Sequence, residues 1–371
     1  MWTHYGIRCF WSHADVLALL RDRRLGRAAA ARTVAYRLPA FASVERYSLL
    51  ELEPPEHTAL RRLVNRAFVS RSIAALAPGI EKRAHELIDA ILANGSPCDL
   101  LRSFATPIPV ETIAGLLGVP TEDAPSLLAW SHAICAMYRT PRSEQAEAEA
   151  ERAAAEFDAY LRKAIASRRG GASGGLLGAI VNGPDAPGDD EIVSTAILLL
   201  NAGHEATVHQ IGNAVAAILT AAPDASERAD WLGPERLEAT IEETLRFDPP
   251  LHLFTRTAHE PIGWHCADGS EVHIDRGEEI GLLLGAANHD PRRYERPDRF
   301  DPHRFEGTAS PDQTSFGGGI HFCLGAPLAR MELRIAIRVL FERLPGLALA
   351  DEPRRANTYH FSGYESLPVR W

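Results

Sequence analysis

A glycine-dense stretch with a single cysteine constrains this chain of 371 residues more than any other feature. It reads FGGGIHFCLGAP, runs from Phe316 to Pro327, and directly precedes an apolar segment, residues 328–340, that we predict to be a helix. Glycine permits positive φ angles and lets the backbone approach a flat or bulky ligand closely. The start of a helix stabilises negative charge on a nearby sulfur. The stretch therefore indicates a site in which the thiolate of Cys323 binds a ligand.

Other kinds of site fit these residues less well. A phosphate-binding loop would require Lys followed by Ser or Thr after its last glycine, whereas Ala326 and Pro327 follow here. A zinc site would require further Cys or His residues at short spacing, and His321 alone is close. One thiolate leaves most of a metal's coordination to another group, and a porphyrin supplies four nitrogens. Because lone cysteines are often inert buried side chains, spacing alone leaves a haem thiolate and a structural cysteine both open.

The fixed residues of the stretch resemble the haem-binding signature of the cytochrome P-450 superfamily at every position. These residues are Phe316, Gly317, Gly319, His321, Cys323 and Gly325. The resemblance implies that the chain binds haem b, with Cys323 as the iron ligand. It also implies that Phe316, Gly317, His321 and Gly325 contribute to haem binding. The implied fold is mainly α with small β-sheets, with a long central helix over the haem and the cysteine loop before a proximal helix.

Composition limits the class of protein. The chain is 46% hydrophobic and 24% charged, which is typical of a globular protein, and we expect one domain over residues 1–371. Its five cysteines lack paired spacing, which favours a reducing compartment. The longest apolar run, residues 192–200, is too short to span a membrane, and no signal peptide is recognisable. A net charge of −10 does not favour nucleic-acid binding. We therefore expect a cytoplasmic monomer that binds neither nucleic acid nor membrane.

The pattern along the chain is mostly helical. Relative to the family, the chain begins close to the second strand, so we expect either a compact start or a misassigned start codon. The long helix at 191–219, which we expect Asp189 and Asp190 to cap, is apolar on nearly all sides at 192–202 and should be buried. The other expected elements are a helix at 15–25, an irregular segment at 33–48, successive helices from 72 to 168, a loop with at most one short helix at 169–188, and strands at 251–258 and 270–284.

The middle of the long helix carries polar residues that need an explanation. Either His204 and Glu205 face a wet groove, or they belong to a functional site. The segment Ala202–Thr207 resembles the family's oxygen-activating sequence Ala-Gly-x-Glu-Thr-Thr, which assigns a catalytic role to Glu205 and its neighbours Ala206 and Thr207. Ala206 stands where the family usually has its first threonine, and Thr207 is turned about 100° away on the helix. The missing hydroxyl leaves three bridges for proton delivery: an ordered water, Thr207, or a hydroxyl of the substrate, which we favour.

Further segments resemble the parts of the family that hold the haem. His57 and Arg61 lie on one helical face and are alone typical of a solvated surface pair. They match the family's Pro-Pro-Glu-His-x-x-x-Arg segment, and Arg256 matches an arginine on a strand, so the resemblance implies that all three bind haem propionates.

A pair of charges on a predicted helix resembles another family feature. Glu243 and Arg246 alone are typical of an exposed ion pair of little energetic value. The segment 297–305 resembles the family's Pro-x-x-Phe-x-Pro-x-Arg-Phe sequence. The resemblance implies that Arg304 joins the pair in a buried structural triad.

Helical phase predicts the wall that contacts the substrate. Five residues of the long helix share one stripe: Leu198, Asn201, Ala202, Glu205 and Ala206. His252 and Phe254 lie on one face of the strand that we expect to oppose it, and the family places the turn at Phe361 against the substrate. Because buried polar groups need partners, Asn201 and His252 favour a small substrate with hydrogen-bonding groups.

The resemblance implies a haem-thiolate monooxygenase that inserts one oxygen atom of O2 into a small organic substrate. No reductase segment is recognisable, so we expect NAD(P)H to act only indirectly, through a ferredoxin and a ferredoxin reductase. Family geometry suggests docking on four arginines, which are Arg62, Arg66, Arg330 and Arg334. The alternative is a haem-thiolate protein with another role, namely a binding or docking module, non-oxidative chemistry or peroxide-dependent oxygenation, and the loss of threonine at position 206 favours it.

Overall fold

The computed structural model describes residues 6–27, 37–68, 70–138, 142–171, 174–307, 312–356 and 361–371. Contacts between Cα atoms divide the chain into two compact units. The first consists of Met1–Ala28, Glu81–Ala105 and Ala206–Trp371, and the second of Ala29–Ile80 and Thr106–Glu205. That the whole chain forms one domain remains our prediction.

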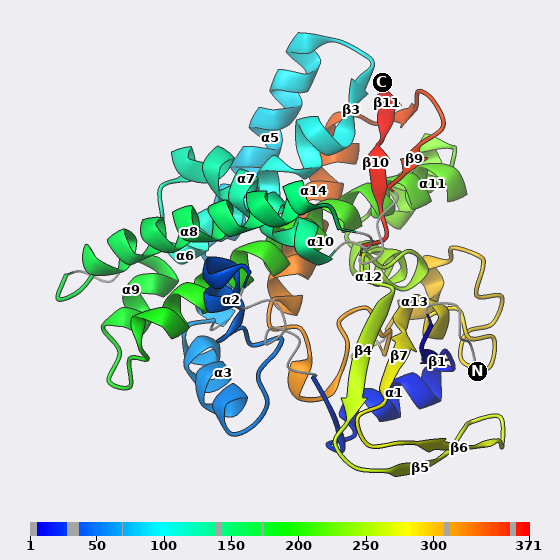
Figure 1. Cartoon of the computed structure of the whole chain (residues 1–371). Coiled ribbons are helices and arrows are strands. Elements are labelled where there is room, and N and C mark those ends of the chain that lie inside the picture. Colours follow the sequence, from blue (N-terminus) through cyan, green and yellow to red (C-terminus); the bar gives the residue numbers. More distant parts are fainter. Residues whose placement is uncertain are drawn as a thin grey trace. The chain divides into compact units, whose positions relative to one another are not determined.

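The first unit is built around a four-stranded sheet in the order β1-β7-β4-β2 (Figure 1). Strand β1 (Arg8–Phe10) runs parallel to β7 (Glu279–Leu283), which pairs antiparallel with β4 (Leu253–Ala258). Short β2 (Leu25–Gly26) covers the outer edge of β4. Helices α1 (His13–Arg21) and α13 (Leu284–Ala287) add buried side chains to the core on this sheet, including Leu19 and Leu284.

The remaining strands of the first unit form three smaller sheets. They are the hairpin β5 (Ile262–His265) with β6 (Glu271–Ile274), the pair β9 (Arg354–Arg355) with β10 (Tyr364–Ser366), and the sheet β3 (Cys98–Asp99), β11 (Pro368–Arg370) and β8 (Ala348–Leu349).

The other helices of the first unit include the one that follows the cysteine. Helix α14 (Ala326–Arg343) begins after Gly325 and carries Pro327 in its first turn, where a missing N–H costs no hydrogen bond. Helix α12 (Leu237–Phe247) ends before Asp248 and two prolines, which cannot continue a helix. The further helical segments are α5 (Ala77–Asn94), which begins in the second unit, the π-helix η2 (Leu101–Ala105), α11 (Ala225–Trp231), and the 3-10 turns η5 (Pro302–Phe305) and η6 (Gly319–His321).

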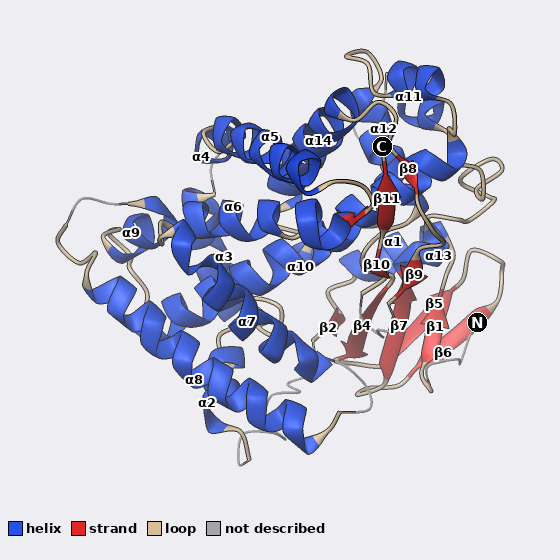
Figure 2. Ribbon diagram, turned by 90° about the horizontal axis from the view of Figure 1, so that it is seen from above, coloured by secondary structure: helices blue, strands red, loops and turns tan. Residues whose placement is uncertain are grey.

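The described residues of the second unit form helices joined by turns and loops, and none of them lies in a strand. Its longest helix apart from α10 is α8 (Glu144–Ala166), which lies beside α7 (Ala124–Cys135) and α2 (Pro39–Glu45) (Figure 2). The hydroxyl of Ser143 accepts a hydrogen bond from the backbone N–H of Ala146 and caps α8. Half of the buried residues of this helix are alanines. The other elements are α3 (Glu56–Ala67), α4 (Ser70–Ala74), α6 (Pro107–Leu117), α9 (Gly175–Val181) and the 3-10 turns η3 (Thr121–Asp123) and η4 (Ala136–Tyr138).

Helix α10 (Asp189–Ala221) is a single helix of 33 residues that contributes to both units. At a rise of 1.5 Å per residue it is about 50 Å long. Asp189 and Asp190 lie within its first turn, so the prediction that they precede the helix was wrong by two residues. Acidic side chains in this turn still interact favourably with the helix dipole.

The predicted fold class, mainly α with small β-sheets, is confirmed. The predicted helix at 15–25 ends earlier, because residues 25–26 form strand β2. The segment at 33–48 is not wholly irregular, since it contains α2, and its first four residues lie outside the described ranges. The strands predicted over 270–284, with a turn at 275–277, are confirmed as β6 and β7 with that turn between them. Among the described residues no helix is both long and apolar enough to cross a membrane.

Candidate active site

The loop that carries Cys323 is closed on itself by backbone hydrogen bonds. The N–H of Cys323 donates to the carbonyl of Phe316 over 3.0 Å, and the N–H of Gly317 donates to Thr314 over 2.8 Å. Gly317 and Gly319 have φ angles of 70° and 67°, which L-residues with a side chain rarely adopt. The loop therefore presents Cys323, partly exposed, three residues before α14 begins.

Close packing also requires glycine at these two positions. A Cβ atom at Gly319 would collide with the backbone carbonyl of Leu20 in α1, and one at Gly317 would lie 2.8 Å from the ring of Phe254 in β4. Gly325 differs, because a Cβ there would make ordinary contact, 3.9 Å, with the sulfur of Cys323. Glycine at 325 therefore leaves space beside the sulfur that no other described protein atom fills.

A polar network fixes the segment that leads into the loop. The hydroxyl of Ser315 donates to the carbonyl of Leu245 over 2.7 Å and accepts from the amide of Asn288 over 2.9 Å. The side-chain oxygen of Asn288 in turn accepts from the N–H of Thr314 over 2.7 Å. All of these side chains are buried, so their hydrogen bonds hold the loop rigidly against α12.

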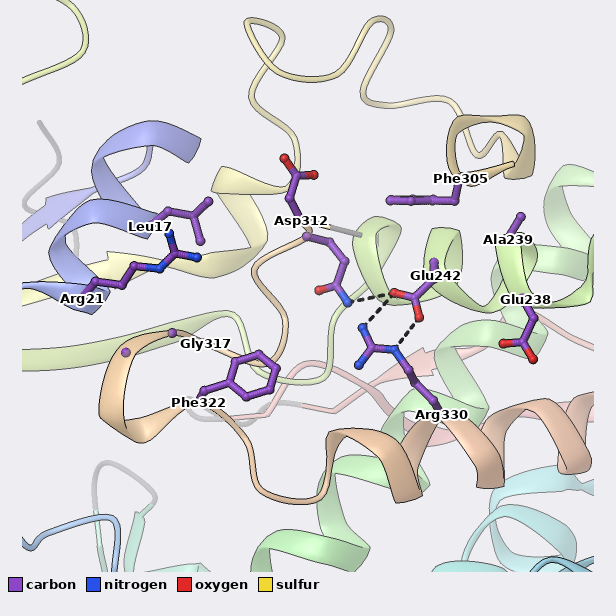
Figure 3. Close-up of a pocket in the computed structure, with 13 residues that line it drawn as sticks. Leu17, Arg21, Glu238, Ala239, Glu242, Phe305, Asp312, Gly317, Phe322 and Arg330 are labelled. Carbon is purple, nitrogen blue, oxygen red and sulfur yellow. Dashed lines mark hydrogen bonds and ion pairs between the residues drawn. The ribbon is translucent and has the colours of Figure 1, made fainter. Parts of the chain in front are cut away.

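The guanidinium of Arg330 in α14 connects the loop to α12. It lies 4.5 Å from the ring centroid of Phe316 and forms an ion pair with Glu242, with Nη2 and Oε2 3.0 Å apart (Figure 3). A cavity of about 840 Å³ opens beside this pair. Its lining includes Gly317–Gly319 and Phe322 but not Cys323, so it is not where the sulfur would meet a ligand.

Strand β4 places a buried cation in the first unit. Arg256 is 4% exposed, its Nη1 donates to the carbonyl of Thr255, and its guanidinium carbon lies 5.9 Å from the ring centroid of Phe254. His252, just before the strand, is neutral near pH 7 because burial lowers its pKa. Phe361 pairs with Leu251 through an isolated β-bridge and therefore lies next to the start of this strand.

In the second unit, His57 and Arg61 lie one turn apart on α3. His57 is only 2% exposed, so the alternative of a solvated surface pair is wrong for it, whereas Arg61 is half-buried. A buried histidine needs a hydrogen-bonding or charged partner.

The exposure of α10 changes in the middle of the helix. Leu198, Glu205 and Ala206 are half-buried and Ala202 is exposed, which is the pattern of one helical stripe. Asn201 departs from the predicted stripe, since it is 6% exposed and its Oδ1 has no hydrogen-bond partner among the described residues. Thr207 is also buried, at 5% exposure, on another side of the helix from Ala206.

Side chains of this part of α10 pack tightly within the second unit. Gly203 lets Ile113 of α6 approach so closely that a Cβ would lie 2.7 Å from its Cδ1. His204 is fully buried, which contradicts the idea that it faces a wet groove.

The structure brings Glu243, Arg246 and Arg304 into contact. Nε and Nη2 of Arg246 donate to the two oxygens of Glu243 over 2.7 and 2.8 Å, and Nε of Arg304 lies 3.5 Å from Oε1. Arg246 also donates to the carbonyls of Asn288 and Pro297, and both members of the Glu243–Arg246 pair have no exposed surface. The pair is therefore buried, unlike the exposed pair that its spacing alone would suggest.

Comparison with known proteins decides the family. Residues 235–347 match the family model for cytochrome P-450. The cytochrome P-450 monooxygenase PikC of Streptomyces venezuelae is 38% identical over 88% of this chain and 76% of its own length. Mycinamicin IV hydroxylase/epoxidase of Micromonospora griseorubida is 36% identical over 87% of this chain and 79% of its own. The crystal structure of CalO2 superposes with a TM-score of 0.89 at 30% identity, covering 99% of this chain and 91% of CalO2.

This chain belongs to the cytochrome P-450 family. It is therefore a haem-binding oxidoreductase of the P-450 monooxygenase type, and its mainly helical fold is the P-450 fold.

The residues of the P-450 loop fit the haem that the family implies. Cys323 is not part of a disulfide and lies on a rigid loop, so its sulfur could serve as a ligand of the haem iron. Gly325 leaves space beside that sulfur, and the N-terminal end of α14 stabilises its negative charge. Arg256 supplies a buried positive charge that suits a carboxylate group of the cofactor.

Sequence reasoning missed two histidines next to the predicted site. His209 continues the stripe of α10 one turn beyond Ala206 and stacks on Phe361, with ring centroids 5.7 Å apart. It fits so tightly that a Cβ at Gly363 would overlap its Nδ1. The phase of the helix, extended by one turn, would have identified it.

The second histidine is His132 of α7, whose Nε2 lies 3.4 Å from Oε2 of Glu205. The two residues are distant in the sequence and belong to different helices, so no local pattern could have identified this contact.

Proposed function

We propose that this P-450 inserts one oxygen atom of O2 into a small organic substrate that carries hydrogen-bonding groups. The observation that carries the proposal is the Cys323 loop, where glycine is required at 317 and 319 and space is left beside the sulfur. When bound, haem supplies the iron chemistry that activates dioxygen. The chain itself then has to hold the cofactor, orient the substrate and move protons.

We assign the haem-binding tasks as follows. Cys323 would be the thiolate ligand of the haem iron, and Phe316, Gly317 and Gly325 shape the loop around it. We assign propionate binding through charge-assisted hydrogen bonds to His321, Arg256, His57 and Arg61, as the family resemblance implies. The burial of Arg256 and His57 supports these roles, since hydrogen bonds to a charged group are stronger where water is excluded.

We assign substrate contact to the half-buried stripe of α10 and to the start of β4. The residues are Leu198, Asn201, Ala202, His252, Phe254 and Phe361. We add His209, because its ring stacks on that of Phe361. Asn201 supports a polar substrate, because its buried Oδ1 has no hydrogen-bond partner among the described residues. His252 is neutral near pH 7, so it acts as a hydrogen-bonding group and carries no charge there.

Proton delivery in this P-450 differs from the usual acid–alcohol pair. Glu205 is the acid, and Ala206 offers no hydroxyl beside it. Thr207 is buried on another side of the helix, which leaves water or a substrate hydroxyl as the bridge. Of these two we favour the substrate hydroxyl. A proton relay needs its donors within hydrogen-bond reach of one another, so the bridge must be present in the substrate complex.

Electrons come from separate redox partners of the ferredoxin and ferredoxin reductase type, fed by NAD(P)H. Of the four arginines considered for docking, two are already paired within the first unit: Arg330 with Glu242, and Arg334 with Glu238. Their charges are therefore largely compensated, and a positive patch built on them would be weaker than the sequence alone suggests.

The alternative, a haem-thiolate protein that does not use O2, is favoured by one feature, the absence of a hydroxyl at position 206. The test combines two measurements on the purified holoprotein. Substrates are first found by the shift of the haem Soret band, and turnover with surrogate ferredoxin partners is then followed under ¹⁸O₂. Incorporation of ¹⁸O into product supports the monooxygenase. Product that forms only with peroxide, or ligand binding without any product, would favour the alternative.

A further inference from the structure

A cluster of three side chains in the second unit has the composition of a metal site. Nε2 of His132, from α7, and Nε2 of His204, from α10, lie 3.4 and 3.2 Å from Oε2 of Glu205. One ligand atom from each residue lies within 4.8 Å of the other two. Two imidazoles and one carboxylate thus converge on one small volume.

The hydrogen bonding of His204 determines which of its nitrogens faces this volume as an acceptor. Nδ1 lies 2.9 Å from the carbonyl oxygen of Leu200, which can only accept, so Nδ1 carries the hydrogen. In the neutral ring Nε2 then has a lone pair. His204 is fully buried, and its Nε2 has no hydrogen-bond partner among the described residues. A lone pair and a carboxylate oxygen 3.2 Å apart repel each other unless a positive charge lies between them.

The distances match the edges of a tetrahedral zinc site. Zinc binds histidine nitrogen at about 2.0–2.1 Å and carboxylate oxygen at about 2.0–2.2 Å, which places tetrahedral ligands about 3.3–3.5 Å apart. The two separations from Oε2 of Glu205, 3.4 Å to Nε2 of His132 and 3.2 Å to Nε2 of His204, are close to this value. The bond from Nδ1 of His204 to a backbone carbonyl is also the arrangement that orients metal-binding histidines.

The exposure of the three residues gives an ion a way in. The side chain of His132 is 54% exposed and that of Glu205 15%, whereas His204 is closed off. An ion can therefore reach the cluster from the solvent side of α7, and water can fill a fourth position.

We propose that His132, His204 and Glu205 bind one divalent transition-metal ion, with zinc the best match to the two-nitrogen, one-oxygen donor set. This site is separate from the haem iron, to which we assign Cys323, but it takes its carboxylate from Glu205, so a bound metal ion would block the proton relay proposed above. The competing explanation is that a second proton on His204 supplies the positive charge, in which case the cluster is an ion pair and binds no metal.

The test is equilibrium dialysis of the untagged holoprotein against zinc, with bound zinc measured by mass spectrometry. We expect one zinc per chain, and His132→Ala and Glu205→Gln are each expected to weaken its binding at least about 10- to 100-fold. His265→Ala is the matched control, because His265 is an exposed histidine 3.2 Å from Glu271 with no second histidine in the pair. It should bind zinc as the unaltered chain does.

X-ray absorption at the zinc edge identifies the ligands independently of activity, since iron absorbs at another energy. Nitrogen and oxygen neighbours at about 2.0–2.2 Å are expected, without a sulfur neighbour at about 2.3 Å. Equal zinc binding by the unaltered chain and by His132→Ala, or a sulfur neighbour from one of the free cysteines, would overturn the proposal. Because His132 is mostly exposed, its alanine variant should fold, and an unchanged Soret band checks this. The measurement needs neither substrate nor turnover, so its outcome does not depend on the function proposed above.

Discussion

At the scale of single residues, Cys323 is held by its own backbone N–H, which donates to Phe316 and does not involve the sulfur. Cys323→Ser should therefore fold, yet it should lose the spectrum of the thiolate, because a neutral hydroxyl donates less charge to iron. The absorbance of the reduced, CO-bound protein measures this. Cys266→Ser, at another partly buried cysteine, is the control and should keep the thiolate band. A thiolate band that survives in Cys323→Ser would contradict the assignment of the ligand.

Ala206 allows a second test at this scale. If the substrate supplies the bridging hydroxyl, Ala206→Thr should change the ratio of product to consumed NADH only modestly, by less than about threefold. A substrate analogue without that hydroxyl should bind and release hydrogen peroxide, because the relay then lacks a donor. Ala206→Val controls for added bulk. A large gain in coupling from Ala206→Thr alone would instead indicate that the missing threonine limits the chain as a monooxygenase.

At the scale of elements, the cysteine loop depends on the close approach of two backbones. Gly319→Ala should lose haem and stability, because the new Cβ collides with the carbonyl of Leu20 and the residue keeps a positive φ. Gly269→Ala is a matched control, since its φ is 84° but no atom lies within 4 Å of the added Cβ. The control should cost only about 1–2 kcal/mol from backbone strain. Haem content and urea unfolding measure both effects, and equal losses in the two variants would show that contact with α1 is unimportant.

The buried ion pair of α12 gives a second prediction for an element. Arg246→Ala leaves the buried carboxylate of Glu243 with the N–H of Asp301, 2.8 Å away, and Nε of Arg304, 3.5 Å away. Removing one partner of a buried pair costs about 3–5 kcal/mol in the free energy of unfolding. Arg162→Ala, which breaks surface pairs with Asp158 and Asp190, should cost less, about 1 kcal/mol. Chemical denaturation of both variants gives the comparison, and normal yield and stability of Arg246→Ala would mean that the triad is dispensable.

Helix ends that depend on local residues can be predicted from the sequence, whereas contacts between distant elements cannot. Local signals mark the ends of some helices, since Ser143 caps the start of α8 and Gly118, with a positive φ, ends α6. Helix α2 was missed because its first N–H groups bond to the side chain of Glu151, more than a hundred residues away. The contact of His132 with Glu205 was missed for the same reason. Periodicity describes the neighbours within one element, and it says nothing about partners on another.

At the scale of the whole molecule, haem should act as part of the folded structure. A ligand that binds the folded chain and not the unfolded one raises stability by mass action. Removal of haem should therefore lower the unfolding temperature by several degrees, and added haem should restore it. Calorimetry of the apo and reconstituted proteins measures this. An unfolding temperature that is the same with and without haem would contradict the proposal that the folded chain holds the cofactor.

The identity of the haem ligand could be predicted from the sequence because its motif is local and long. The substrate could not, since it depends on which side chains line the space around the stripe of α10. Asn201 illustrates this, because helical phase placed it beside Ala202 although the structure buries it.

The fit between His209 and Gly363 has a consequence for how this chain can evolve. Any side chain at 363 overlaps the imidazole of His209, which is itself held against Phe361. A lineage can therefore replace Gly363 only after a smaller residue has appeared at 209. In the reverse order, the intermediate protein would contain a steric clash between the new side chain and His209. Descendants that keep histidine at 209 should keep glycine at 363, so changes at these two positions should be inherited in a fixed order.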